Sequence, residues 1–305
     1  MEENVTREME EEQIQKEQAA EVKVENAKKP KGWKAIVAGF FITVLFLVIQ
    51  SIVSVLGTSI VTVGIMAEYD VSTITQEELT NLLLDSGAMT VMLFFAILIT
   101  GIVALIWYKA GYVKKYTKEN RMELKEKAGN VKVIGSLILA GIGCYSLAIL
   151  IASVIALISP AAMDNFNNMM SSATGGNAVL SFLTVVILAP IAEEVIFRGI
   201  IFRKLLITNS AKVAIIAQAL LFAFYHFNIV QGIYVLPIAL VLGYTAYKFN
   251  SVLPCILIHA MNNLMPTFVS LLPEALQSVA VFAALAVICI VAIYLINKER
   301  QEKAC

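Results

Sequence analysis

The chain has 305 residues, of which 59% are hydrophobic and only 15% are charged, and its formal net charge is zero. Soluble domains average about half apolar and about a quarter charged residues, so this composition argues against a soluble globular protein and indicates a membrane protein. The four cysteines lack CxxC or zinc-finger spacing, which argues against a disulfide framework, and we expect no nucleic-acid partner.

The chain begins with an acidic, polar stretch. Residues 1–33 contain nine glutamates and no apolar run, which predicts a solvated, disordered cytoplasmic tail. We expect residues 34–297 to form one transmembrane domain, followed by a short cytoplasmic tail at 298–305.

The next 260 or so residues are dominated by apolar runs. A helix needs about 20 apolar residues to cross a hydrocarbon core of about 30 Å. The predicted fold is therefore all-α, a polytopic integral membrane helix bundle of about eight transmembrane helices. Seven spans are the alternative, if the fifth and sixth form a re-entrant pair. The eight runs are 36–65, 88–108, 133–158, 178–197, 212–227, 229–248, 252–270 and 277–296.

The lysines and arginines predict the orientation, because cytoplasmic loops carry the excess of positive charge. With eight spans all 23 of them fall on one face of the membrane, whereas seven spans would separate those at 298–303 from the rest. Both termini are therefore expected in the cytoplasm. The basic residues lie at 7–34, 109–132, 198–212, 248 and 298–303.

Polar residues interrupt the later apolar runs. Ionisable groups inside a span cost about 2.5–3.5 kcal/mol on insertion scales and are by default functional candidates. We expect these side chains to face one another around a small polar cavity: Glu193, Glu194, Arg198, His226, His259, Asn262 and Asn263.

Depth along the helices supports one cavity. Glu193 and His226 each lie about 15 residues from the turn at 207–210, so both are roughly 22–24 Å from it and can meet in an antiparallel hairpin. His259 lies roughly 12 Å beyond the turn at 250–251, which agrees if the hairpin projects into the cytoplasm. The cavity is then expected in the cytoplasmic half of the bilayer.

Spacing within each helix predicts two pairs. Glu194 and Arg198 are four residues apart, so they can form an ion pair with a mainly structural role, while Glu193 points about 100° away and is free for chemistry. His259 and Asn263 share the same spacing and present an imidazole and an amide together.

Three classes of function fit a carboxylate, two imidazoles and an amide. A glutamate and a histidine can activate a water while the other groups donate to an oxyanion. Alternatively, Glu193, His226 and His259 could bind a divalent metal such as zinc. A transporter or channel, or simple helix packing, uses the same residue types.

Three motifs in order resemble a known family. EEVIFR at 193–198, FAFYH at 222–226 and HAMNN at 259–263 match the EExxxR, FxxxH and HxxxN motifs. The chain thus resembles the CAAX prenyl endopeptidase and bacteriocin-processing (CPBP, Abi) family of intramembrane proteases.

The resemblance implies an endopeptidase of membrane-associated peptide or protein substrates, in a bacterial cell membrane and open towards the cytoplasm. It implies that Glu193 and His226 activate the water, that His259 and Asn263 stabilise the oxyanion, and that Glu194 and Arg198 support the site. Whether a metal takes part stays open. Some relatives act as partners, so a non-catalytic membrane partner or bacteriocin-immunity factor is the alternative function.

Overall fold

The computed structural model describes residues 32–69, 74–112 and 130–302, and the regular structure in these ranges is helical throughout. The predicted all-α fold is therefore confirmed. The predicted N-terminal tail lies outside the described residues, except for its last two positions. The predicted C-terminal tail begins as a continuation of the last helix, which extends to Glu302.

Five helical segments are long and apolar enough to cross a membrane, which indicates an integral membrane protein. They coincide with five of the eight predicted runs, and three shorter apolar helices coincide with the others. The long segments are α2 (Gly32–Glu68), α4 (Ala88–Gly111), α6 (Val131–Ile158), the fourth segment (Ala178–Leu206) and α12 (Ile229–Phe249). The shorter ones are α11 (Ala211–Tyr225), α13 (Leu253–Val269) and the apolar first part, Val279–Ile288, of α14 (Val279–Glu302).

Two further helices lie between the predicted apolar runs, where no helix was predicted. Helix α3 (Gln76–Asp85) begins with a capping box, in which Thr75 and Glu78 bond reciprocally to each other's backbone N–H. Helix α7 (Pro160–Thr174) begins with a proline, which is preorganised for a first helical turn. Both are polar and short, so apolar runs could not reveal them.

The fourth segment contains two π-helical stretches and is longer than its predicted end at 197. Its parts are α8 (Ala178–Phe182), π-helix η2 (Leu183–Leu188), α9 (Ala189–Glu194), π-helix η3 (Val195–Ile201) and α10 (Phe202–Leu206). π-Turns inside α-helices are rare overall, but those that occur are frequently found at functional sites. Here they lie on both sides of the Glu193–Glu194 pair.

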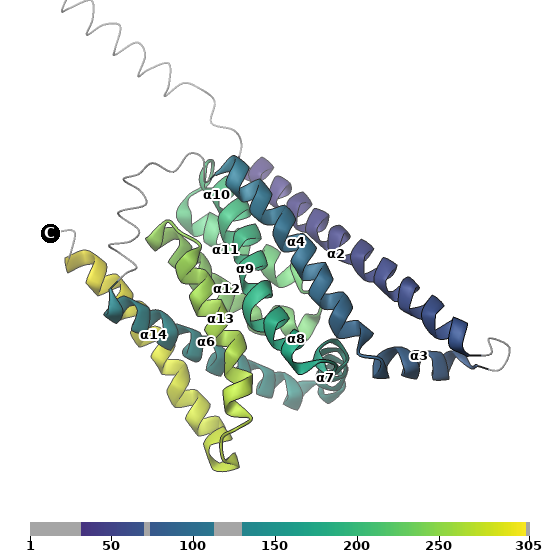
Figure 1. Cartoon of the computed structure of the whole chain (residues 1–305). Coiled ribbons are helices and arrows are strands. Elements are labelled where there is room, and N and C mark those ends of the chain that lie inside the picture. The colour runs from purple at the N-terminus through teal and green to yellow at the C-terminus, as the bar shows by residue number, and fades with distance from the viewer. Residues whose placement is uncertain (1–31, 70–73, 113–129, 303–305) are drawn as a thin grey trace, which may run out of the picture.

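The fourth segment lies in the middle of the bundle. Figure 1 shows α2 and α4 side by side along one flank, α6 and α14 crossing at the other, and α9, α11, α12 and α13 between them. Helix α9 packs against α4 and α13. Two glycines permit close approach: a Cβ atom at Gly101 would lie 3.2 Å from that of Ala192, and one at Gly141 would lie 2.7 Å from the carbonyl oxygen of Ile258.

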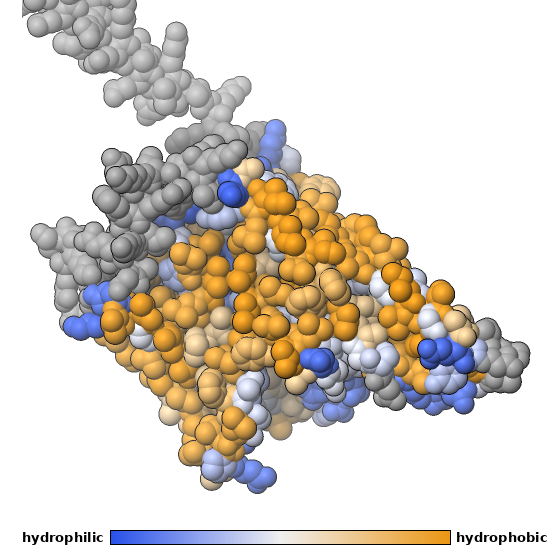
Figure 2. All heavy atoms as spheres, in the orientation of Figure 1, coloured by the Kyte–Doolittle hydropathy of each residue, from blue (hydrophilic) through white to orange (hydrophobic). Residues whose placement is uncertain are grey.

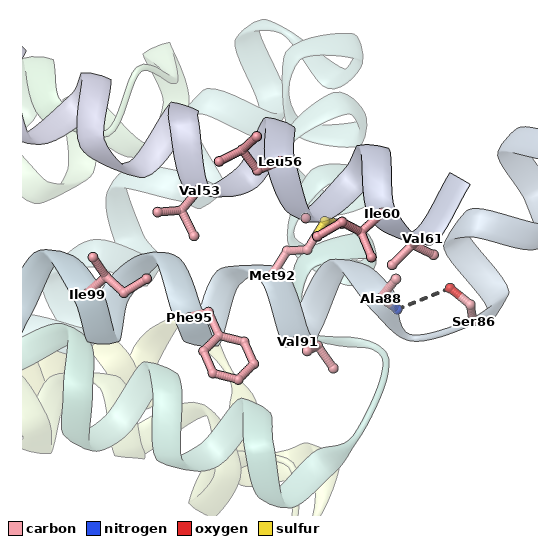
Figure 3. Close-up of a pocket in the computed structure, with 11 residues that line it drawn as sticks. Val53, Leu56, Ile60, Val61, Ser86, Ala88, Val91, Met92, Phe95 and Ile99 are labelled. Carbon is pink, nitrogen blue, oxygen red and sulfur yellow. Dashed lines mark hydrogen bonds between the residues drawn. The ribbon is translucent and has the colours of Figure 1, made fainter. Parts of the chain in front are cut away.

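The surface suits a hydrocarbon environment. Hydrophobic side chains cover much of the face shown in Figure 2, and large apolar residues such as Ile60 and Leu157 are exposed. Between α2 and α4 runs an apolar groove of about 610 Å³ with Leu56, Met92 and Phe95 in its walls (Figure 3). The groove contains none of the polar residues that the sequence singled out.

Candidate active site

The first π-helix, η2, leaves one backbone carbonyl without its helical partner. In η2 the Ala189 N–H bonds to the carbonyl of Thr184, five residues back. The next such bond would join residue 190 to Val185, but Pro190 has no N–H. The Asn263 amide of α13 donates to the Val185 carbonyl instead, at 2.9 Å. Asn263 is therefore tied to the fourth segment.

Glu194 and Arg198 form the ion pair that their spacing predicted. Arg198 Nη1 lies 2.9 Å from Glu194 Oε1, and both side chains are fully buried, at 0% exposure. The second guanidinium nitrogen donates to the carbonyl of Ala239 on α12 at 3.2 Å, and the guanidinium lies 4.5 Å from the centre of the Phe222 ring. A buried charge needs such partners, because an unpaired one is costly.

Gln218 of α11 completes this network, and the sequence interpretation missed it. Its Nε2 donates to the same Ala239 carbonyl at 2.8 Å, and its side chain is completely buried. Gly243 provides the space for the Gln218 side chain, because a Cβ atom at position 243 would collide with the Gln218 amide. The presence of a glutamine within the apolar run at 211–225 was the sequence signal that could have identified Gln218 as part of the site.

His259 lies between the two glutamates. Its Nδ1 is 2.8 Å from Glu194 Oε1, and its Nε2 is 3.8 Å from Glu193 Oε2. A carboxylate paired with arginine can only accept, so Nδ1 of His259 carries the hydrogen and Nε2 faces Glu193. Besides forming the predicted pair with Arg198, Glu194 therefore also orients His259.

His226 joins the cluster through Phe222. It follows the last residue of α11, its Nδ1 lies 2.9 Å from the Phe222 carbonyl oxygen, and its ring packs 4.7 Å from the Phe222 ring centre. The carbonyl can only accept, so Nδ1 again carries the hydrogen. The Phe222 ring also faces His259, at 6.0 Å between ring centres. Phe222 is thus a core side chain.

The expected close approach of Glu193 to His226 is not among the contacts of the described residues. Both glutamate carboxylates lie within 4 Å of His259 instead, at 3.8 Å for Glu193 and 2.8 Å for Glu194. His226 is therefore connected to Glu193 through Phe222 and then His259.

The site does not fit a three-ligand metal centre. In the described ranges no group of three or more His, Cys, Asp or Glu side chains converges as a metal site. Glu193 and His259 approach each other, with 3.8 Å between Oε2 and Nε2. The candidate metal ligands from the sequence therefore do not form a cluster.

Several buried polar atoms at the site have no hydrogen-bond partner among the described residues. Buried polar groups are nearly always paired, so an exception needs an explanation, and a ligand or water that belongs there is one. On residues of the site and beside it, these atoms are Glu193 Oε2, Glu194 Oε2, Arg198 Nε, Gln218 Oε1, the Tyr225 hydroxyl and Asn262 Oδ1. Glu193 is also the more exposed of the two glutamates, at 16% against 0% for Glu194.

Comparison with known proteins identifies the segment that carries this cluster. Residues 175–265 match the sequence model of a family described as type II CAAX prenyl endopeptidase Rce1-like. No curated protein and no solved structure matches the chain. The match contains both glutamates, Arg198, both histidines and Asn263, so the resemblance given by the three motifs is confirmed. Over residues 175–265 the chain is a domain of the Rce1-like type II CAAX prenyl endopeptidase family.

Proposed function

We propose that this protein is an intramembrane endopeptidase that hydrolyses peptide bonds of membrane-associated substrates with a water activated by Glu193. The observation that carries the proposal is the buried Glu193 Oε2, which has no hydrogen-bond partner in the described structure and faces His259 Nε2 at 3.8 Å. Membership of a protease family supports the reaction class.

The proposed first step is attack by water. Glu193 accepts a proton from the water, whose oxygen bonds to the scissile carbonyl carbon while the C=O electron pair moves to the carbonyl oxygen. His226, with its hydrogen on Nδ1, offers Nε2 as a second acceptor that orients the water. The C–N bond then breaks, and Glu193 returns the proton to the departing amine.

His259 and Asn263 support the developing charge in this proposal. His259 Nε2 becomes a donor once it is protonated, and the Glu194 carboxylate at Nδ1 stabilises the resulting imidazolium. One Asn263 N–H is used by Val185, which leaves the other for the oxyanion. Glu194 and Arg198 act as positioning residues.

We also propose that α11, α13 and α14 complete eight crossings, with both termini and the site on the cytoplasmic side of a bacterial cell membrane. The distribution of the 23 basic residues supports this orientation. Reporter fusions after residues 69, 175 and 272 should lie outside the cell and a fusion at the C-terminus inside. A C-terminal reporter that lies outside contradicts the eight-span count.

Cleavage by purified protein tests the proposed reaction. We would reconstitute the wild type, Glu193→Gln and Glu274→Gln in liposomes with two quenched fluorogenic peptides, a farnesylated peptide ending in Cys-aliphatic-aliphatic-X and an unmodified apolar peptide. Glu274 is an exposed glutamate before α14 and serves as the matched control. We expect cleavage by the wild type and the control and loss of at least 10³-fold in kcat for Glu193→Gln. Cleavage that survives in Glu193→Gln contradicts the proposal.

A further inference from the structure

Each histidine of the site uses its Nδ1 hydrogen on a fixed acceptor. For His259 the acceptor is Glu194 Oε1, at 2.8 Å, and for His226 it is the Phe222 carbonyl, at 2.9 Å. In its neutral form each imidazole has one N–H, so each Nε2 then presents only a lone pair. Neither neutral histidine can donate a hydrogen bond to a substrate carbonyl.

Peptide hydrolysis nevertheless needs donors aimed at the carbonyl oxygen before charge develops on it, because preorganised donors cost no reorganisation during the reaction. In the described part of the site, these donors must come from groups other than the two neutral imidazoles. The asparagine amides are partly used: Asn262 donates to Asn263 at 2.9 Å, and Asn263 donates to Val185.

Tyr225 supplies an uncommitted donor. Its hydroxyl is buried and has no hydrogen-bond partner among the described residues. A phenol buried without a partner is unusual, since buried tyrosines ordinarily find one. The hydroxyl can donate without losing its proton, in contrast to a histidine that must first be protonated.

The placement of Tyr225 is consistent with this role. The residue directly precedes His226, and the two rings lie 6.3 Å apart between centres and nearly perpendicular, at 88°. The Tyr225 ring also packs 5.2 Å from the ring of Phe197 on η3, and this contact fixes the orientation of the Tyr225 side chain. The Phe197 ring in turn packs 5.0 Å from the Phe222 ring, which faces His259, so Tyr225 belongs to the aromatic cluster beside the site.

We propose that the Tyr225 hydroxyl is a catalytic residue that donates a hydrogen bond to the scissile carbonyl oxygen as it becomes the oxyanion. The hydroxyl keeps its proton throughout, so the bond changes are those of the hydrolysis itself. This inference rests on the proposed endopeptidase function.

The test compares Tyr225→Phe with Tyr145→Phe, Tyr234→Phe and Glu193→Gln, all as full chains in liposomes with the two peptides named above. Tyr145 is a matched control, because it is a buried tyrosine of α6 that packs against Phe282 in a separate apolar cluster. Tyr234 of α12, whose ring packs against that of Phe166, is the competing donor.

For Tyr225→Phe we expect kcat to fall about 10²–10³-fold with KM changed less than about threefold, as for loss of one oxyanion donor. Its thermal unfolding midpoint should equal or exceed that of the wild type, since the removed hydroxyl had no partner; a structural hydroxyl would lower it. Tyr145→Phe should keep its kcat.

Two results would overturn the inference alone: a Tyr225→Phe kcat within threefold of the wild type while Glu193→Gln is inactive, or a loss that appears in Tyr234→Phe instead. Activity in Glu193→Gln, or no cleavage of either peptide by the wild type, would count against the proposed function itself.

Discussion

The Asn263 amide occupies the place of the N–H that Pro190 lacks, and it does so by donating to the carbonyl of Val185 at 2.9 Å. This bond joins α13 to the π-helical turn just before the two glutamates. A residue that the family resemblance assigns to the oxyanion therefore also holds two helices together.

The first prediction concerns this bond. Asn263→Ala should lower the free energy of unfolding by about 1–3 kcal/mol, because the part-buried Val185 carbonyl loses its partner. Thermal or denaturant unfolding in detergent measures the change, and Asn167→Ala, at an exposed position on α7, is the control. In a Pro190→Ala background residue 190 regains its N–H, so the same Asn263 substitution should cost less. An equal cost in both backgrounds would refute the assignment of this bond.

The second prediction concerns Glu194. Glu194→Gln should lower the free energy of unfolding by about 3–5 kcal/mol, because it leaves the Arg198 charge buried without its counter-ion. The double variant Glu194→Gln with Arg198→Met should recover part of this loss. Membrane-fraction abundance and unfolding in detergent give the comparison. Normal abundance with complete loss of turnover would instead make Glu194 the chemical residue and reverse the roles of the two glutamates.

The third prediction concerns the contact of α6 with α13. A Cβ atom at Gly141 would lie 2.5 Å from the Cβ of Met261 and 2.7 Å from the Ile258 carbonyl oxygen, so α13 must move in Gly141→Ala. We expect a loss of about 1–3 kcal/mol in stability and, because His259 lies on α13, at least a tenfold loss of kcat.

Gly135→Ala in the same helix is the control for Gly141→Ala. A Cβ atom at Gly135 meets nothing within 4 Å, so this variant should be about 0.5–1 kcal/mol more stable than the wild type and fully active. Equal behaviour of the two alanine variants would show that the close approach is unimportant.

The fourth prediction concerns metal removal. Because the described histidines and glutamates do not converge as a metal site, cleavage should survive dialysis against a chelator, and the zinc content should be well below one per chain. Metal analysis and cleavage on the same preparation give both quantities. One zinc per chain that disappears together with the activity would establish a metalloprotease and require the site to rearrange.

The sequence predicted the apolar helices and the local pairs well, because both depend on residues within one or two turns. The position of each of the eight runs, and the Glu194–Arg198 pair, followed from hydropathy and i,i+4 spacing. The contacts that organise the site join different helices. The bond of His259 to Glu194 and the shared use of the Ala239 carbonyl depend on how three helices rotate against one another, which periodicity cannot determine.

The neighbours of each histidine were less predictable for the same reason. Counting residues from the turns gave the depth of Glu193 and His226, but depth alone does not give the direction of a side chain around its helix axis. The π-helical turns changed that direction for the fourth segment.

A π-turn holds one residue more than the α-helical turn that it replaces. The fourth segment can therefore be described as an α-helix with an insertion on each side of Ala189–Glu194. Deleting one residue from η2 would leave the ends of the segment connected but turn everything beyond it by about 100°. Both glutamates would then face other neighbours with their own sequence unchanged. In this bundle, the length of the chain before the EEVIFR motif determines the neighbours of the two glutamates as much as the motif itself does.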